Sequence, residues 1–106
     1  MRATVAALRD ELGCAAGSLR RYAGDTYAGG NRWVLAALWL GLWYRQVGED
    51  HGLELALTYA LGAQTSLGLL PEQVTDDGEP AWVVPLAWSH AMLLLAARPE
   101  LSFARR

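Results

Sequence analysis

The sequence predicts an all-α fold, built from helical hairpins that form part of a larger helical protein. Hydrophobic residues make up 53% of the 106 residues and charged residues only 19%, a composition too apolar for intrinsic disorder. Apolar residues recur with helical spacing in four segments, whereas the sequence has no strand pattern of useful length. Very apolar and amphipathic helices alternate, as in a ring of stacked hairpins with an inner and an outer layer.

Charge and composition exclude several classes of partner. The net charge of -2 offers no electrostatic basis for binding nucleic acid or an anionic membrane. The longest apolar stretch, 34–44, lies between Arg32 and Arg45 and is shorter than the about 20 residues of a membrane helix. Acidic residues stand where a secretory signal would have its apolar core, so a cytoplasmic location is expected. The single cysteine, Cys14, excludes an internal disulfide, and without metal-ligand spacing no metal or cofactor is expected.

The first helix is predicted over about 4–13, with Thr4 as a candidate N-cap and Val5, Leu8 and Leu12 on one face. Residues 20–32 contain three glycines without periodicity, which predicts a loop.

The second helix is predicted over about 33–47, with Gly48 following its end. Apolar residues surround its whole circumference, so it should be the most buried element. Trp39 and Trp43 are predicted to be core residues.

The third helix should run from Asp50, a suitable N-cap, to about residue 67, with Gly68 ending it. Its apolar stripe consists of Leu53, Leu57, Ala60 and Leu61. Gly52 weakens its first turn by about 1 kcal/mol relative to Ala.

A second long loop, 69–84, is rich in turn residues and contains a stretch that can form a hairpin. Pro85 then suits the first turn of a last helix that ends near 97, before Pro99. Because two antiparallel helices separate the two long loops, both loops should emerge on the same side, where function usually lies.

The two loops carry residue types that suit a sugar site. The first offers Arg21, Asp25 and Trp33, and the second Glu72 and Trp82. Aromatic faces pack on pyranose rings, Arg and Asp bond hydroxyls, and a carboxylate can activate water.

The order of these residues resembles glycoside hydrolase family 15, the glucoamylases and glucodextranases. The resemblance rests on RRYAGDTYAGGNRWVLAALWLGLWY in the first half and GLLPEQVTDDGEPAWVVPLAWSHAMLLLA in the second. It extends over about 18–97. It implies an (α/α)6 barrel, of which residues 1–106 would supply about the last third as a C-terminal fragment of the catalytic domain.

The resemblance also implies an activity, the inverting release of glucose from the non-reducing ends of α-glucans or oligosaccharides. Glu72 of LPEQ matches the catalytic general base, and Arg21 matches the arginine that bonds sugar hydroxyls. Asp25 is expected to orient Arg21, and Trp33 to wall a sugar subsite. From the residues alone, Glu72 is also compatible with an exposed loop carboxylate, and Trp33 with the core. His90 is expected to be a core histidine bonded to a carbonyl.

The sequence departs from the family pattern at three points. Arg32 stands where the family usually has Pro, and Gly29 where Asn is frequent. The general acid of the family belongs to an earlier part of the barrel and has no counterpart here, so the missing N-terminal part of the barrel is an expected partner and the isolated chain is expected to be inactive. Two alternatives remain: a trehalase or glucodextranase activity of the same family, and a non-catalytic helical remnant or interaction module.

Overall fold

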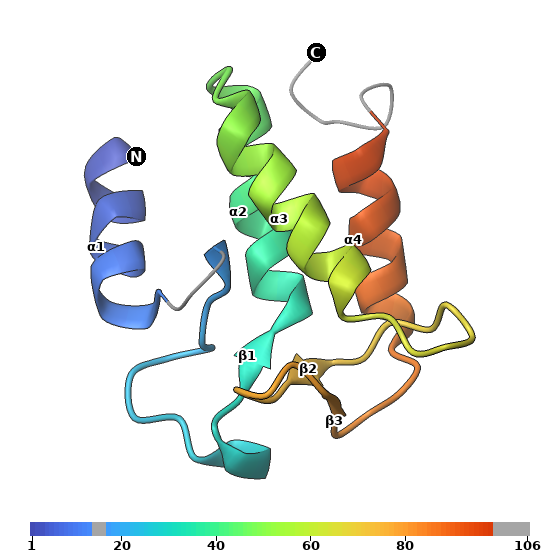
Figure 1. Ribbon diagram of the computed structural model, residues 1–106. Coiled ribbons are helices and arrows are strands. Elements are labelled where there is room, and N and C mark those ends of the chain that lie inside the picture. Colours follow the sequence, from blue (N-terminus) through green and yellow to red (C-terminus); the bar gives the residue numbers. More distant parts are fainter. Residues whose placement is uncertain (14–16, 99–106) are drawn as a thin grey trace.

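The computed structural model describes residues 1–13 and 17–98. Within these residues, four α-helices and three two-residue strands follow one another along the chain (Figure 1), which confirms the mostly helical prediction. The helices are α1 Arg2–Leu12, α2 Val34–Gln46, α3 Asp50–Gly62 and α4 Ala87–Ala97, and the strands are β1 Arg32–Trp33, β2 Gln73–Val74 and β3 Pro80–Ala81. The predictions for Cys14 and Pro99 fall outside the described residues.

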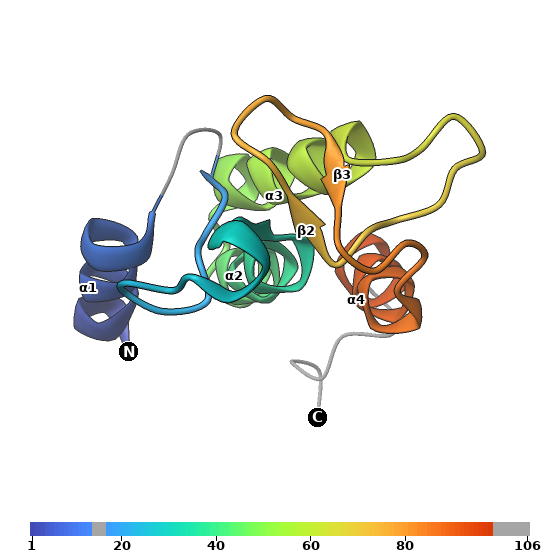
Figure 2. The same ribbon diagram turned by 90° about the horizontal axis from the view of Figure 1, so that it is seen from below.

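The core lies where α2 packs against α3 and α4 (Figures 1 and 2). As expected from its apolar circumference, α2 is the most buried of these helices, with Val34, Ala37 and Leu38 fully inaccessible to solvent. Ala60 of α3 and Ala96 of α4 close the same cluster. Burial of these side chains supplies the main driving force for holding the three helices together.

Small residues let α2 and α3 approach closely. A Cβ atom added to Gly41 would lie 2.7 Å from the Cβ of Ala56, and one added to Gly52 would lie 2.3 Å from the ring of Tyr44. Both distances are far shorter than a van der Waals contact. Packing against Tyr44 therefore requires glycine at position 52, in spite of the low helix propensity of glycine.

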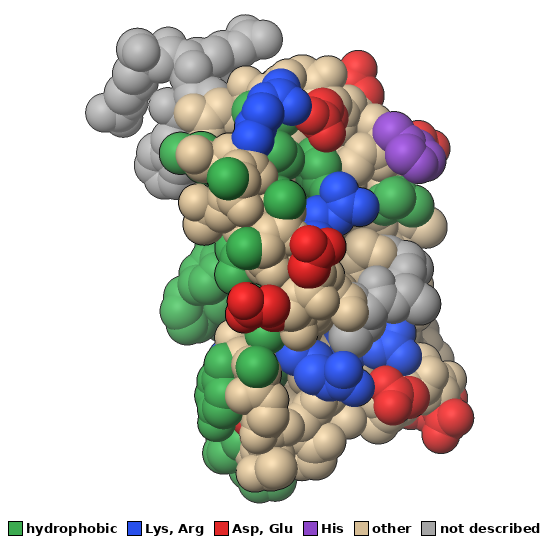
Figure 3. Space-filling model, turned by 90° about the vertical axis from the view of Figure 1, so that its left-hand side faces the viewer, with side chains coloured by type: hydrophobic (Ala, Val, Ile, Leu, Met, Phe, Trp, Pro, Cys, Tyr) green, Lys and Arg blue, Asp and Glu red, His purple; other side chains and the backbone are tan. Residues whose placement is uncertain are grey.

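The helix α1 stands beside the three packed helices (Figure 1). Its buried residue is Val5. The cluster around Val5 is completed by Leu19, Leu40 and Tyr44. Leu8, predicted on the same face, is 40% exposed. Figure 3 shows this side of the molecule, where acidic and basic side chains are interspersed.

Three helix boundaries differ from the prediction. The helix α1 begins at Arg2 rather than at Thr4. The helix α3 ends at Gly62 instead of near 67, because Thr65 organises a following turn in which its hydroxyl accepts the Leu69 N–H at 3.1 Å. The helix α4 begins at Ala87, two residues after Pro85.

The strands form one antiparallel sheet in the order β1-β2-β3. Arg32 pairs with Val74 and Trp33 with Gln73, which in turn pairs with Ala81. The predicted hairpin in the second loop is confirmed, and so is the meeting of the two long loops on one side of the helices (Figure 1). In the described part of the chain, no helix has the length and apolarity needed to cross a bilayer.

Candidate functional site

The two long loops are joined by backbone hydrogen bonds at one end of α2. The N–H of Trp33 donates to the carbonyl of Leu19 at 2.9 Å, and the N–H of Val34 donates to the carbonyl of Glu72 at 3.2 Å. The start of α2 is thereby tied to both loops. Every predicted site residue lies in or beside this junction.

Arg21 and Asp25 form a bidentate ion pair. Nε of Arg21 donates to Oδ2 of Asp25 at 3.0 Å, and Nη2 donates to Oδ1 at 2.9 Å. The Asp25 side chain has no solvent exposure, whereas that of Arg21 is 34% exposed. The backbone N–H of Tyr27 adds a third bond to Oδ1 at 2.9 Å. The predicted orientation of Arg21 by Asp25 agrees with this geometry.

These bonds stabilise the charged forms of both side chains. The hydrogen bonds from Arg21, assisted by the Tyr27 N–H, lower the pKa of Asp25 below its ordinary value. The hydrogen bond to Asp25 raises the pKa of Arg21. Both groups are therefore charged at neutral pH, and the guanidinium plane is fixed by its fork geometry.

Three aromatic rings surround the Arg21 guanidinium. Its central carbon lies 4.7 Å from the ring centre of Tyr27, 4.9 Å from that of Tyr22 and 5.0 Å from that of Trp33. All three distances fall within cation–π range. The indole Nε1 of Trp33 is buried and has no hydrogen-bond partner among the described residues. The structure thus brings together three of the predicted residues: Arg21, Asp25 and Trp33.

Glu72 is half-buried at the residue before β2. Its N–H donates to the carbonyl of Val83 at 2.9 Å, so its backbone is held from both sides of the hairpin junction. Its Oε2 accepts a hydrogen bond from Nε2 of Gln73 at 3.1 Å. Gln73 is fully buried, and its own Oε1 has no partner among the described residues. The carboxylate is therefore oriented by a neighbour that cannot move freely.

The first turns of α4 anchor the loop that carries Glu72. The buried hydroxyl of Ser89 donates to the carbonyl of Pro71 at 2.8 Å. Nε2 of His90 accepts the N–H of Leu70 at 2.9 Å. The prediction that His90 bonds a carbonyl is wrong, because its ring nitrogen faces a backbone donor and serves as the acceptor. Sequence reasoning missed both anchoring roles, although the Trp-Ser-His run was the available signal.

Arg32 links the two loops. Its Nη2 and Nε donate to Oδ1 of Asp76 at 3.0 and 3.3 Å. A second link joins Tyr27 to Trp82, whose rings meet edge to face with centres 5.5 Å apart. These contacts join side chains of the first loop to side chains of the second.

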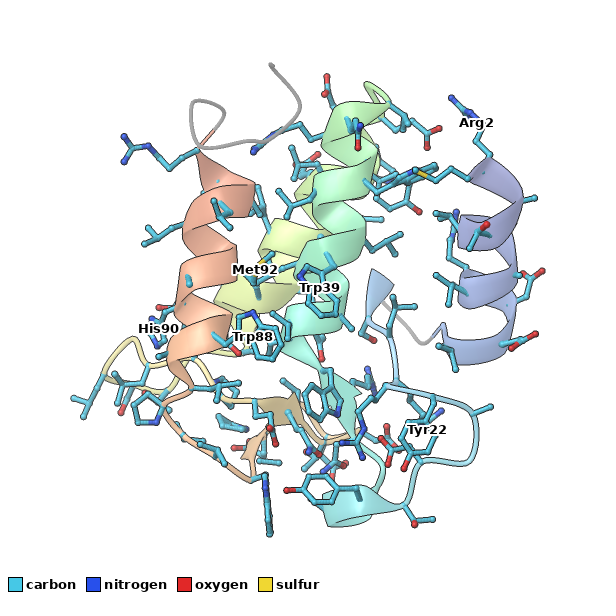
Figure 4. All side chains as sticks on the ribbon, turned by 180° about the vertical axis from the view of Figure 1, so that it is seen from behind. Arg2, Tyr22, Trp39, Trp88, His90 and Met92 are labelled. Carbon is cyan, nitrogen blue, oxygen red and sulfur yellow. The ribbon has the colours of Figure 1, made fainter. Side chains whose placement is uncertain are left out.

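An open apolar groove of about 600 Å³ extends from Arg21 along α1, α2 and the start of α4. The prediction that Trp39 belongs to the core is wrong: Trp39 is 50% exposed and packs edge to face on Trp88, at 5.7 Å between ring centres. Figure 4 shows the two rings side by side. Trp39 is exposed because no described element covers this side of α2. The groove is lined by large apolar side chains, among them Val5, Leu8, Leu12, Trp33, Trp39 and Trp43.

The chain is similar in sequence to segments of two curated proteins. The chain is 35% identical over 92 residues to an uncharacterized glycosyl hydrolase of Methanocaldococcus jannaschii, an overlap of 74% of this chain and 15% of that protein. It is 31% identical over 93 residues to an isomaltose glucohydrolase of Kribbella flavida, covering 76% of this chain and 24% of that protein.

The fold has a solved counterpart as well. The structure of a wild-type glycosidase superposes with a TM-score of 0.76 and 31% identity, covering 91% of this chain and 29% of that one. No protein-family model matches the chain. The chain thus spans between 15% and 29% of the length of these proteins. In both sequence and fold, it is similar to a segment of glycoside hydrolases.

Proposed function

We propose that this chain forms the C-terminal part of the catalytic domain of a glucoamylase-like glycoside hydrolase of family 15, with an inverting mechanism. The observation that carries the proposal is the placement of Glu72. A half-buried carboxylate is held at the junction of the two loops, beside the strand that ends in Trp33. Arg21 packs on that Trp33 ring. Glu72, the proposed water-activating group, and Arg21, the proposed sugar-binding group, are thus both attached to the junction of β1 and β2.

In this proposal, Glu72 acts as the general base. Its carboxylate accepts a proton from a water molecule while that water attacks the anomeric carbon on the face opposite the leaving group. The bond from buried Gln73 occupies Oε2, which leaves the second carboxylate oxygen to receive the proton. A general acid from another part of the hydrolase would protonate the leaving oxygen, at about 6.5–9.5 Å from the base.

Arg21 binds sugar hydroxyls in the same proposal. Its Nε and Nη2 are engaged with Asp25, so the pair presents the remaining guanidinium N–H groups in a fixed direction. Trp33, whose ring lies 5.0 Å from that guanidinium, forms the apolar wall on which a pyranose ring packs. Asp25 is fully covered and acts by positioning Arg21.

The proposed partner is the remainder of such a hydrolase. The groove of about 600 Å³ is bordered by Trp39 and Trp88, each at least half exposed, and exposed apolar patches of this kind mark interaction sites. Because Arg21 and Trp33 line one end of it, helices seated there would bring further residues to the sugar site. The general acid would come from that part of the protein.

A chimera tests the function directly. This chain would replace the similar 93-residue segment of the isomaltose glucohydrolase of Kribbella flavida, and hydrolysis of isomaltose, maltotriose and trehalose would be measured. We expect hydrolysis of α-glucosides, and a fall in kcat of about 10²–10⁴-fold in Glu72→Gln, as for loss of a general base.

Glu79→Gln provides the matched control, because Glu79 is an exposed carboxylate in the same hairpin. Equal losses in both variants would contradict the assignment of Glu72. Preference for trehalose would favour the trehalase alternative, whereas cleavage of isomaltose, the α-1,6 disaccharide named for the host, would report on the host and not on the glucodextranase alternative. A folded chimera without any hydrolysis would favour a non-catalytic helical module.

A further inference from the structure

Trp82 occupies an unfavourable position for a large apolar residue. Its φ of 66° lies in the left-handed region, where a side chain with a Cβ atom is strained and Gly is preferred. Its indole is 60% exposed. The stability of the fold does not account for a tryptophan at this position, because a glycine would adopt this backbone conformation without strain and would expose no large apolar side chain. Residues held in such conformations concentrate at functional sites.

The position of Trp82 is nevertheless well defined. It follows β3, in which Ala81 pairs with Gln73, and it precedes Val83, whose carbonyl accepts the N–H of Glu72. Trp82 therefore sits across the hairpin from Glu72. Both residues lie just outside the strands, Glu72 directly before β2 and Trp82 directly after β3, so that each adjoins the Gln73–Ala81 pair.

An aromatic contact fixes the ring as well. The edge-to-face contact with Tyr27, at 5.5 Å between ring centres, connects Trp82 to the ring that packs 4.7 Å from the Arg21 guanidinium. Rings from both loops thus form one continuous group around Arg21. Trp82 is the member of this group with the largest exposed fraction, against 50% for Tyr22 and 44% for Tyr27.

We propose that Trp82 is a sugar-binding residue, whose exposed indole packs against a pyranose ring of an α-linked gluco-oligosaccharide. The inference rests on the proposed function and deepens it. An indole face is complementary to the apolar C–H face of a pyranose, and the contact of Trp82 with Tyr27, which packs on Arg21, would put that sugar on the same group of rings as the proposed sugar-binding arginine. The residue would favour oligosaccharides over free glucose, because a ring beyond the first gains the contact.

The test uses the 106-residue chain with ¹⁵N-labelled indoles. Maltotriose, isomaltotriose, glucose and the acyclic polyol sorbitol are titrated while the five tryptophan Nε1–H signals are followed by NMR. We expect a saturable shift of the Trp82 signal with the trisaccharides and none with sorbitol. Trp82→Gly, which suits the backbone, should weaken trisaccharide binding about 5- to 10-fold.

Trp82→Phe keeps an aromatic face and should retain most of the affinity. Trp39→Phe alters a tryptophan of similar exposure (50%) in the groove and should leave the trisaccharide affinity unchanged. Circular dichroism confirms that each variant is folded before titration.

Two results distinguish a failure of sugar binding by Trp82 from a failure of the proposed hydrolase function. Unchanged trisaccharide affinity in folded Trp82→Gly, or a Trp82 signal that does not respond to trisaccharide, would overturn the role of Trp82. Either result leaves the chimera and its Glu72→Gln variant to decide the hydrolase function. Conversely, an inactive chimera combined with a saturable response at Trp82 would show oligosaccharide binding without hydrolysis.

Discussion

Asp25 gives Arg21 a fixed direction that a single exposed ion pair would not provide. Two hydrogen bonds from the guanidinium, at 3.0 and 2.9 Å, and a third from the Tyr27 backbone hold the carboxylate. Because the carboxylate is covered completely while the guanidinium is partly exposed, the pair offers donors rather than acceptors to a ligand. A sugar hydroxyl oxygen is a suitable acceptor for them.

The pair also predicts a pH dependence of stability. Folding lowers the pKa of Asp25 through the Arg21 bonds. The stability it contributes is therefore present above the pKa of an unfolded aspartate, about 3.9, and is lost as the pH falls through the lower folded value. We expect the free energy of unfolding of wild type to exceed that of Asp25→Asn at neutral pH, with the gap narrowing in acid. Urea unfolding followed by circular dichroism measures it.

Arg21→Gln is the companion variant, because it removes the largest cause of the lowered pKa of Asp25. In the Arg21→Gln background, the further change Asp25→Asn should have a smaller pH-dependent effect than in wild type, because the Arg21 bonds are lost while the Tyr27 N–H bond remains. A gap between wild type and Asp25→Asn that stays constant from neutral to acid pH would contradict the role of the pair.

The sequence predicted those site residues that belong to a recognisable motif. Arg21, Asp25 and Trp33 were identified from one run of sequence, and Arg21 contacts both of the other residues. The sequence did not predict the hydrogen bond from Gln73 to Glu72. Nor did it predict the bonds that join Ser89 and His90 to the second loop. Their partners depend on side-chain direction at the strand and helix ends, which residue spacing alone does not determine.

At the scale of the elements, Gly52 shows how tertiary packing overrides helix propensity. Propensity favours Ala at this position in α3 by about 1 kcal/mol. The Tyr44 ring occupies the space that a Cβ would need, at 2.3 Å. We therefore expect Gly52→Ala to lower the free energy of unfolding by about 1–3 kcal/mol, the usual range for overpacking. Denaturant unfolding measures the change.

Gly62 is the matched control within α3, because a Cβ there would meet no atom within 4 Å. Gly62→Ala should raise the free energy of unfolding by up to about 1 kcal/mol through reduced backbone entropy of the unfolded chain. If Gly52→Ala stabilises the chain as much as Gly62→Ala does, the close contact of α2 and α3 at Tyr44 is not as described.

Element types were predicted better than element ends. The apolar pattern identified the four helices of the described residues, because burial of a face repeats with the helical period, and the turn residues of the second loop indicated the hairpin. The end of α3 was misplaced by several residues, since Thr65 closes a turn before the next glycine. Side-chain bonds of this local kind compete with helix continuation and leave little trace in periodicity.

At the scale of the whole molecule, the open groove predicts self-association. Trp39, Trp88 and Leu94 are each at least half exposed, and two of them border the groove. Apolar patches of this kind are rarely left open in monomers. We expect the chain to sediment as concentration-dependent oligomers. Trp39→Glu with Trp88→Glu should raise the dissociation constant by at least about tenfold, as burial of charge costs more than 1.4 kcal/mol.

Leu67→Glu is the control, because Leu67 is 83% exposed and does not line the groove. It should leave the oligomers unchanged. A wild-type chain that sediments as a monomer at every concentration would contradict the interpretation of the groove as an interface.

The role of Glu72 is tested most directly by rescue with azide. In the chimera, Glu72→Ala removes the carboxylate that activates water, while azide, already a nucleophile, needs no base. We predict that azide restores cleavage of α-glucoside and that NMR identifies the product as β-glucosyl azide, the inverted anomer. Glu79→Ala should hydrolyse without azide. Failure of rescue in a folded and substrate-binding Glu72→Ala chimera, or a product with the α-configuration, would contradict an inverting general base at Glu72.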